Sequence, residues 1–281
     1  MAPADAVSIK TARKVLHLVD KGLTCGFGDP APGQMCVEAA VCYAMGLPHG
    51  DNPKCVSASV RRFNIELNDL RWSSNKARAR GLRRVAIAQL GSNGVVNDAE
   101  FLCLMAEGTI RKIIPPMLIE VAKCCPEQHV ALLAAACKCR REGTRDSALA
   151  ASFVAATIVA FPGTFAACAE DAAVYAIGAT RKVASTALYY SGDLLHAVGY
   201  IVTATAAAAE AIIYATQAVG SNDIVTSSAE HAAIGHKCDA IRDRYFRTAA
   251  DIAVDALRQL KSPGVRLMDR LFDHTPGRSQ P

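Results

Sequence analysis

The sequence is poor in aromatic residues, which make up 6% of its 281 positions and include a single tryptophan. Hydrophobic residues nevertheless account for 51% of the chain, so Ala, Val, Leu and Ile supply most of its apolar surface. A bias towards small and straight-chain apolar residues favours helix. The chain shows neither a hairpin pattern of alternating strands nor a strand–helix–strand pattern. The sequence therefore predicts an all-α, multi-helical fold.

Three other features are scarce or missing. No Arg-flanked apolar segment opens the chain, so no signal peptide is predicted. The cysteines number eleven, an odd count without the density of a disulfide scaffold. The uncharged run 148–169 is interrupted by Pro162-Gly163, and its pieces are too short to cross a bilayer. We therefore expect a cytoplasmic protein with reduced thiols and no membrane partner.

The glycine-rich stretch Leu23–Gly33 reads LTCGFGDPAPG. Its glycines are reminiscent of a phosphate-binding loop, but neither GxxxxGK[ST] nor GxGxxG after a strand is present. A connecting loop is the better interpretation, and no cofactor is predicted.

Gly143-Thr144 breaks the helical pattern and is predicted to divide the chain into two domains. Residues 1–143 form an N-terminal helical domain with a cysteine-containing loop and a basic stretch. Residues 144–281 form an Ala/Tyr-rich domain, in which small residues let helices approach closely and spaced tyrosines fill the gaps. This composition predicts an antiparallel helical bundle, and self-association into a homo-oligomer through these helices is one expectation.

The first candidate site is a possible cysteine nucleophile. Cys36 is predicted to lie in the first turn of a helix, where the helix dipole lowers the pKa of a thiol. With His49 or His129 as base, it would serve a cysteine-dependent hydrolase or transferase. Gln34, two residues earlier, makes the segment loosely similar to papain-like proteases. The GxCW-type signature and a later strand with His and Asn are absent, and the alternative is a buried thiol acting as a small hydrophobe.

The same segment offers a zinc site as another alternative. The four residues that could converge on one loop are Cys36, Cys42, His49 and Cys55. None of their spacings is the CxxC of structural zinc sites, and the pairs Cys124-Cys125 and Cys137-x-Cys139 are also poor. Buried thiols without a metal are the favoured interpretation.

The second candidate site is the basic stretch Lys54–Arg84. It holds nine cations and two acids, an excess of seven, whereas the whole chain has a net charge of +5. Cations alternate with aromatic residues there, as in surfaces that bind nucleic acid, nucleotides or acidic proteins. The alternative is a solvated helical face. The candidate anion-binding residues are Arg61, Arg62, Arg71, Trp72, Arg78, Arg80, Arg83 and Arg84.

Two parts of the chain carry a resemblance. CVEAAVCYAMGLPHGDNPKCV, followed by LND and GLRRVAIAQLGS, and the Ala/Tyr-rich half ending in ALRQLKSPG cover about two-thirds of it. This pattern, C-x(3)-A, G-D-x-P-x-C-V and then L-N-D, resembles uncharacterised all-helical proteins of bacteria and their phages. The matching residues are Cys36, Ala39 or Ala40, Gly50, Asp51, Pro53, Cys55, Val56, Leu67, Asn68 and Asp69. The resemblance implies an all-helical fold and a phage or prophage association, and it implies no activity.

The sequence thus favours a non-enzymatic binding protein that engages an anionic partner through its basic stretch. The alternatives are a cysteine-dependent enzyme that uses Cys36 and a structural protein that self-associates through its Ala/Tyr helices.

Overall fold

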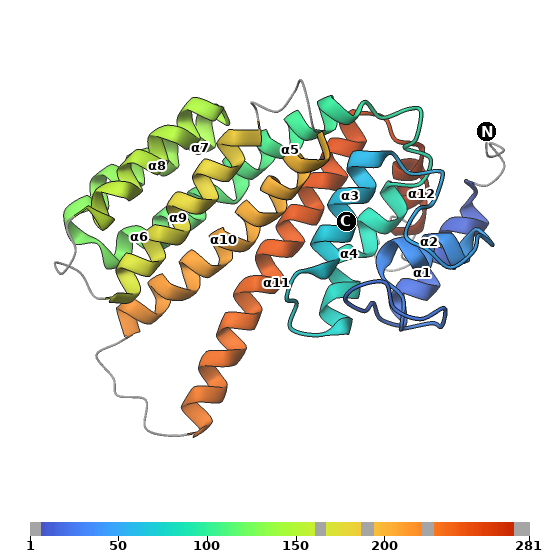
Figure 1. The fold of residues 1–281 in the computed structure, drawn as a ribbon, viewed down its shortest axis with the longest axis horizontal. Coiled ribbons are helices and arrows are strands. Elements are labelled where there is room, and N and C mark those ends of the chain that lie inside the picture. The colour runs from blue at the N-terminus through green and yellow to red at the C-terminus, as the bar shows by residue number, and fades with distance from the viewer. Residues whose placement is uncertain (1–6, 161–166, 187–193, 221–227, 273–281) are drawn as a thin grey trace, which may run out of the picture. The chain divides into compact units, whose positions relative to one another are not determined.

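The computed structural model describes residues 7–160, 167–186, 194–220 and 228–272. Over these residues the chain is all-α, as predicted, and contains no β-strand (Figure 1). An isolated β-bridge between Gly28 and Met35 closes the glycine-rich loop. The helices α8 (Arg145–Val159) and α9 (Ala167–Thr186) flank the predicted break at Pro162-Gly163, which lies outside the described residues.

The chain divides into two compact units. Unit 1 comprises Met1–Leu70, Ser74–Phe101 and Ala250–Pro281, and unit 2 comprises Arg71–Ser73 and Leu102–Ala249. Gly143, at which the sequence predicts a domain boundary, lies within unit 2, between α7 and α8.

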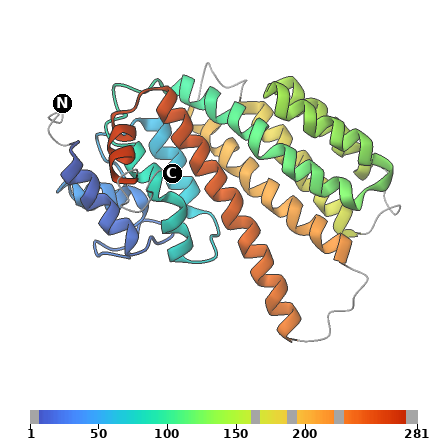
Figure 2. The ribbon, with the colours of Figure 1, turned by 180° about the vertical axis from the view of Figure 1, so that it is seen from behind.

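Unit 1 is built from short helices, and its C-terminal segment returns to pack on its N-terminal part. It contains α1 (Ile9–Asp20), α2 (Val37–Ala44), α3 (Ala58–Asp69), α4 (Asn75–Ala88), the end of α11 (Ser228–Gln259) and α12 (Pro263–Phe272). The helix α12 lies beside α4 (Figure 1 and Figure 2). The approach is close because Gly264 has no side chain: a Cβ there would stand 2.2 Å from the carbonyl oxygen of Ile87.

The core of unit 1 consists of large apolar side chains. Phe63 on α3 and Phe101 at the start of α5 are both fully buried and meet edge to face, with ring centroids 6.2 Å apart. Leu23, Met35 and Leu82 are buried in the same unit. Burial of such side chains is the main stabilising contribution to a fold of this kind.

Unit 2 is built from longer helices with small residues between them. It contains most of α5 (Asp98–Lys112), then α6 (Ile114–Cys124), the 3₁₀ turn η2 (Pro126–Gln128), α7 (His129–Glu142), α8 (Arg145–Val159), α9 (Ala167–Thr186) and α10 (Leu194–Gly220). The helix α9 lies between α8 and α10 and packs against both (Figure 1). Most of the buried residues in α8 to α10 are alanines. One tyrosine pair, Tyr175 on α9 and Tyr214 on α10, is stacked at 5.3 Å between centroids.

One helix in the described ranges, Leu194–Val219, is long and apolar enough to cross a membrane by length and composition, with a mean hydropathy of 1.5. In the structure, 61% of its most apolar 18-residue window is buried.

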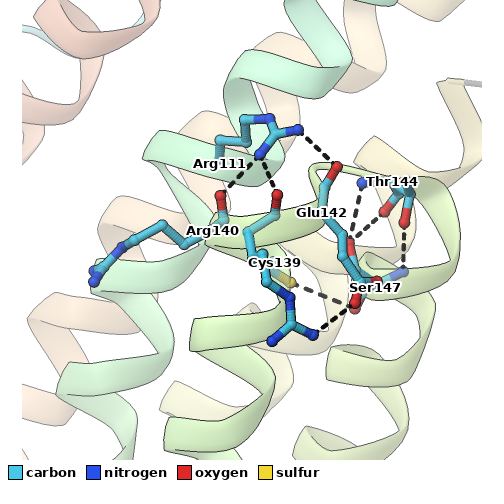
Figure 3. Close-up of polar contacts among 7 residues, drawn as sticks. Arg111, Cys139, Arg140, Glu142, Thr144 and Ser147 are labelled. Atoms are coloured by element: carbon cyan, nitrogen blue, oxygen red, sulfur yellow. Dashed lines mark hydrogen bonds and ion pairs between the residues drawn. The ribbon is translucent and has the colours of Figure 1, made fainter.

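An arginine closes the C-terminal end of α7 (Figure 3). Arg111 on α5 donates hydrogen bonds to the carbonyl oxygens of Arg140, Arg141 and Glu142, at 3.0, 2.5 and 2.8 Å. These carbonyls have no acceptor role inside the helix, so a cation there satisfies them and interacts favourably with the helix dipole. Gly143 ends the helix in the left-handed conformation, at φ +65°.

Candidate functional site

The basic stretch forms α3, the turn after it and α4. Because Ser74 accepts a hydrogen bond from the backbone N–H of Ala77 at 3.1 Å, α4 begins immediately after it. Apolar residues of α4, such as Leu82 and Val85, face the core of unit 1, and Lys76, Arg80 and Arg84 are exposed. The exposed cations of α4 therefore lie beside a row of buried apolar residues on the same helix. The contacts of each cation decide whether it can bind an anionic partner.

Two of the predicted anion-binding residues are buried, which corrects their assignment to an exposed surface. Arg78 donates to the backbone oxygens of Asn68, at 2.7 Å, and Leu23, at 3.0 Å, so its guanidinium group connects α4 to the end of α3 and to the loop after α1. Trp72 packs edge to face on Phe246, with centroids 5.2 Å apart. Arg71 and Trp72 also belong to unit 2, whereas the other predicted anion-binding residues belong to unit 1.

Four of the predicted arginines are partnered within unit 1. Arg62 pairs with Glu66 at 2.5 Å, and Arg61 donates to the side chain of Asn52. Arg83 makes a two-point contact with Asp20, at 2.7 and 2.9 Å. Arg84 pairs with Asp251 at 3.3 Å. All four are at least partly exposed.

Such surface pairs contribute little free energy and exchange readily for other anions. Arg80 differs from the four arginines above, because it donates to the backbone oxygen of Lys76, at 3.4 Å, and not to another side chain.

Sequence reasoning missed the cations of α1, which packs against α4. Lys10, Arg13 and Lys14 are exposed, and their spacing of three and four residues places them on one helical face. That spacing could have identified them from the sequence. Together the exposed and partly exposed cations of the two helices define the α1–α4 surface, which consists of Lys10, Arg13, Lys14, Lys76, Arg80, Arg83 and Arg84.

Cys36 is the N-cap of α2, and it does not lie in the first helical turn. Its sulfur accepts a hydrogen bond from the N–H of Ala39 at 3.3 Å. Burial raises the pKa of this thiol to about 11, which corrects the expectation that the helix dipole lowers it. Cys55 is buried as well, and its thiol lies 3.3 Å from the sulfur of Met45. Cys36 is therefore a thiol at neutral pH and a poor nucleophile.

The two candidate bases are each engaged with a backbone carbonyl. His49 lies 3.0 Å from the oxygen of Gly28 and meets Phe27 edge to face. His129 lies 2.9 Å from the oxygen of Ala122, in unit 2. Within the described ranges, no three His, Cys, Asp or Glu side chains are grouped so that they could hold a metal ion. The predicted cysteine and zinc candidates are thus not assembled into a recognisable centre by the described residues.

Sequence reasoning also missed a buried polar cluster of unit 1, formed by Glu38, Asn64 and Gln89. Glu38 on α2 is fully buried, and the side chain of Asn64 donates to that of Gln89 beside it at 2.7 Å. Burial raises the pKa of Glu38 to about 8, although Asn64 and Gln89 favour its ionised form. Glu38 is the only charged residue in the apolar helix VEAAVCYA, and this isolation is the signal that the sequence offered.

Comparison with known protein families, with curated proteins and with solved structures found no match for this chain. The geometry of the described residues is therefore the basis for a functional proposal.

Proposed function

We propose that the protein is a non-enzymatic binding protein that engages an anionic partner through the α1–α4 surface. The observation that carries the proposal is the accumulation of exposed cations on two packed helices. Lys10, Arg13 and Lys76 have no carboxylate partner among the described residues. A surface of this kind attracts polyanions and gains free energy by releasing their counterions.

The Cys36 environment supports binding over cysteine catalysis. A cysteine nucleophile needs a thiolate and a base within hydrogen-bond reach. Cys36 is buried, is used as a helix cap and has a raised pKa. A phage or prophage association stays a proposal that rests on the resemblance of the Cys36–Asp69 region.

The test is the salt dependence of binding to a short single-stranded oligonucleotide, measured by fluorescence anisotropy of a label on the oligonucleotide. Charge reversal in Lys76→Glu/Arg80→Glu should weaken binding and reduce the slope of log K against log salt by about 1.4, because each of the two lost phosphate contacts on a single strand removes about 0.7. Lys138→Glu/Arg140→Glu on α7 makes the same charge change in unit 2 and should have a smaller effect.

Equal effects of the two variants would show that net charge alone matters and would overturn the proposal. Polyglutamate serves as a competitor that carries negative charge without phosphate. Competition by polyglutamate as strong as that by the unlabelled oligonucleotide would indicate an acidic protein as the partner.

A second candidate function is self-association, which exposed apolar side chains of unit 2 favour. Val130 on α7 is 79% exposed and Phe153 on α8 is 71% exposed. Exposed apolar side chains of this size can mark a protein–protein contact. Light scattering should then give a mass above one chain, and Phe153→Ser should lower it. Val95→Ser, at a 52% exposed site in unit 1, is the control. A monomer at all concentrations would exclude this candidate.

A further inference from the structure

A basic depression lies in unit 1 beside α12. Its volume is about 360 Å³, within the range of small-molecule sites. It is lined by Val7, Lys261, Pro263, Arg266, Leu267 and Arg270. Half of these residues are cations and half are apolar, and no carboxylate is among them. We name this depression the α12 pocket.

The two arginines of the pocket lie on one face of α12. Arg266 and Arg270 are four residues apart, a spacing at which like charges repel each other. The acid nearest to them in sequence, Asp269, is engaged elsewhere: both of its oxygens accept hydrogen bonds from Arg258, at 2.7 and 2.8 Å. In the described part of the chain, neither Arg266 nor Arg270 has an ion-pair partner. An anion in the pocket would relieve this repulsion.

The third cation is held in an unusual backbone conformation. Lys261 has φ +58° and is the single non-glycine residue with positive φ in the described ranges. It follows the last turn of α11, a position where glycine is favoured because a side chain is strained there. The neighbouring residue fixes the chain, since the buried hydroxyl of Ser262 donates to the oxygen of Ala88 at 2.7 Å. Strain that surrounding contacts maintain is typical of functional positions.

We propose that the α12 pocket binds a terminal phosphate group, as carried by a nucleotide or by the 5′ end of a nucleic acid strand. The two guanidinium groups can donate paired hydrogen bonds to phosphate oxygens, and Lys261 adds a point charge. The pocket extends along the side of α12 from Pro263 in its first turn to Arg270 in its last turn. Val7 and Leu267 provide an apolar wall for the sugar or base. The proposal rests on the proposed function, because it narrows the anionic partner to one that ends in phosphate.

The first experiment compares two oligonucleotides of the same sequence, one with a 5′-phosphate and one with a 5′-hydroxyl. The 5′-phosphate should bind roughly tenfold more tightly, the effect of one charge-assisted contact set. Adenosine monophosphate and adenosine are compared in parallel by calorimetry. If only the oligonucleotide with the 5′-phosphate binds more tightly than its 5′-hydroxyl counterpart, the pocket binds strand ends. If adenosine monophosphate binds more tightly than adenosine, the pocket binds free nucleotides. No preference in either pair overturns the proposal.

The second experiment uses variants of the pocket and of the α1–α4 surface. Arg266→Gln/Arg270→Gln should abolish the phosphate preference, whereas Lys76→Glu/Arg80→Glu should weaken both oligonucleotides equally and keep it. Lys261→Gly should raise the melting temperature, because the backbone strain is relieved, and should also reduce the phosphate preference severalfold. If Lys261 had only a structural role, Lys261→Gly would raise the melting temperature and leave the phosphate preference unchanged.

The two proposals fail in different ways. If the surface variant weakens binding and the pocket variants change nothing, the proposed function stands and the phosphate pocket is wrong. If neither oligonucleotide nor the mononucleotide binds, both proposals are wrong.

Discussion

The two units bury their apolar surface by different means. Unit 1 uses short helices and large side chains such as Phe63, Leu67 and Leu82. In unit 2 the helices α8, α9 and α10 contribute mainly alanines, together with a few larger residues such as Ile201 and Ile212. A large side chain gains free energy by its own burial, whereas an alanine gains it by letting two helix backbones approach each other.

The helices of the two units also differ in how many charged residues they carry. In unit 1 the helices α1 and α4 expose clusters of cations, and α4 contains no acidic residue. In unit 2 the helices α8 to α10 have few charged residues, and Glu210 on α10 is paired with Arg242 on α11 at 2.8 Å. The comparison indicates that α1 and α4 of unit 1 present the chemistry for a charged ligand, whereas α8 to α10 of unit 2 present small and apolar residues. Four predictions test or sharpen it.

The largest effect is expected from Phe63→Ala, which leaves a cavity in the core of unit 1. We expect a loss of about 3–5 kcal/mol in the free energy of unfolding. The counterpart in unit 2 is Ala208→Gly, at a fully buried position of α10, which should cost about 1 kcal/mol. Urea denaturation followed by circular dichroism measures both. Equal costs would show that the two cores do not differ in the way described.

A smaller effect is expected where α12 meets α4. Gly264→Ala places a methyl group against the backbone of Ile87 and Ala88, so α12 must shift, at a cost of about 1–3 kcal/mol. Gly178→Ala on α9 is the control, because a Cβ there meets nothing within 4 Å. This control should stabilise the protein by about 0.5–1 kcal/mol. Thermal unfolding of the two variants should therefore shift in opposite directions, and two shifts of the same sign would contradict the packing.

The third effect depends on pH. The pKa of Glu38 is about 8 in the folded state against 4.5 for an ordinary glutamate, so the folded protein binds the extra proton between these values. The free energy of unfolding should therefore fall as pH rises from about 5 to 8, by at most about 1.4 kcal/mol per unit. Nearby charges oppose each other, since Asp51 raises this pKa and Arg61 lowers it.

Glu38→Gln should remove this part of the pH dependence, measured as denaturation midpoints at pH 5, 6, 7 and 8. Glu100→Gln, at an exposed position of the same unit, is the control for loss of one carboxyl group. A wild-type curve parallel to that of Glu38→Gln would contradict the raised pKa.

The smallest effect concerns thiol reactivity and requires no substitution. Cys36, Cys42 and Cys55 of unit 1 are buried, whereas Cys137 of unit 2 is exposed. Because burial raises the pKa of Cys36 to about 11 and that of Cys42 to about 12, little thiolate is present at pH 7.5. Brief alkylation of the native protein followed by peptide mass spectrometry should label the exposed Cys25, Cys103 and Cys137 before Cys36. Early labelling of Cys36 would restore the nucleophile hypothesis.

The sequence predicted the helical class correctly, because its bias towards small apolar residues and its lack of strand patterns are properties of the whole chain. Charge counting located α4, but it could not predict that Arg78 turns inward. That orientation depends on the carbonyl oxygens of Leu23 and Asn68, which the fold brings together. The α12 pocket was missed for the same reason, since Val7 and Arg266 become neighbours only after folding. For Cys36, the helix start was near the predicted position, but the effect of burial outweighed that of the helix dipole.

The contact between Arg111 and Gly143 limits which sequences can keep this corner of unit 2. A Cβ at position 143 would lie 2.4 Å from Nε of Arg111, so the arginine and the glycine occupy complementary space. A larger residue at 143 requires a shorter one at 111, and the carbonyl oxygens that end α7 would then need another donor. Among divergent copies of this chain, the two positions should therefore change together, and an insertion between α7 and α8 should be accompanied by loss of the arginine.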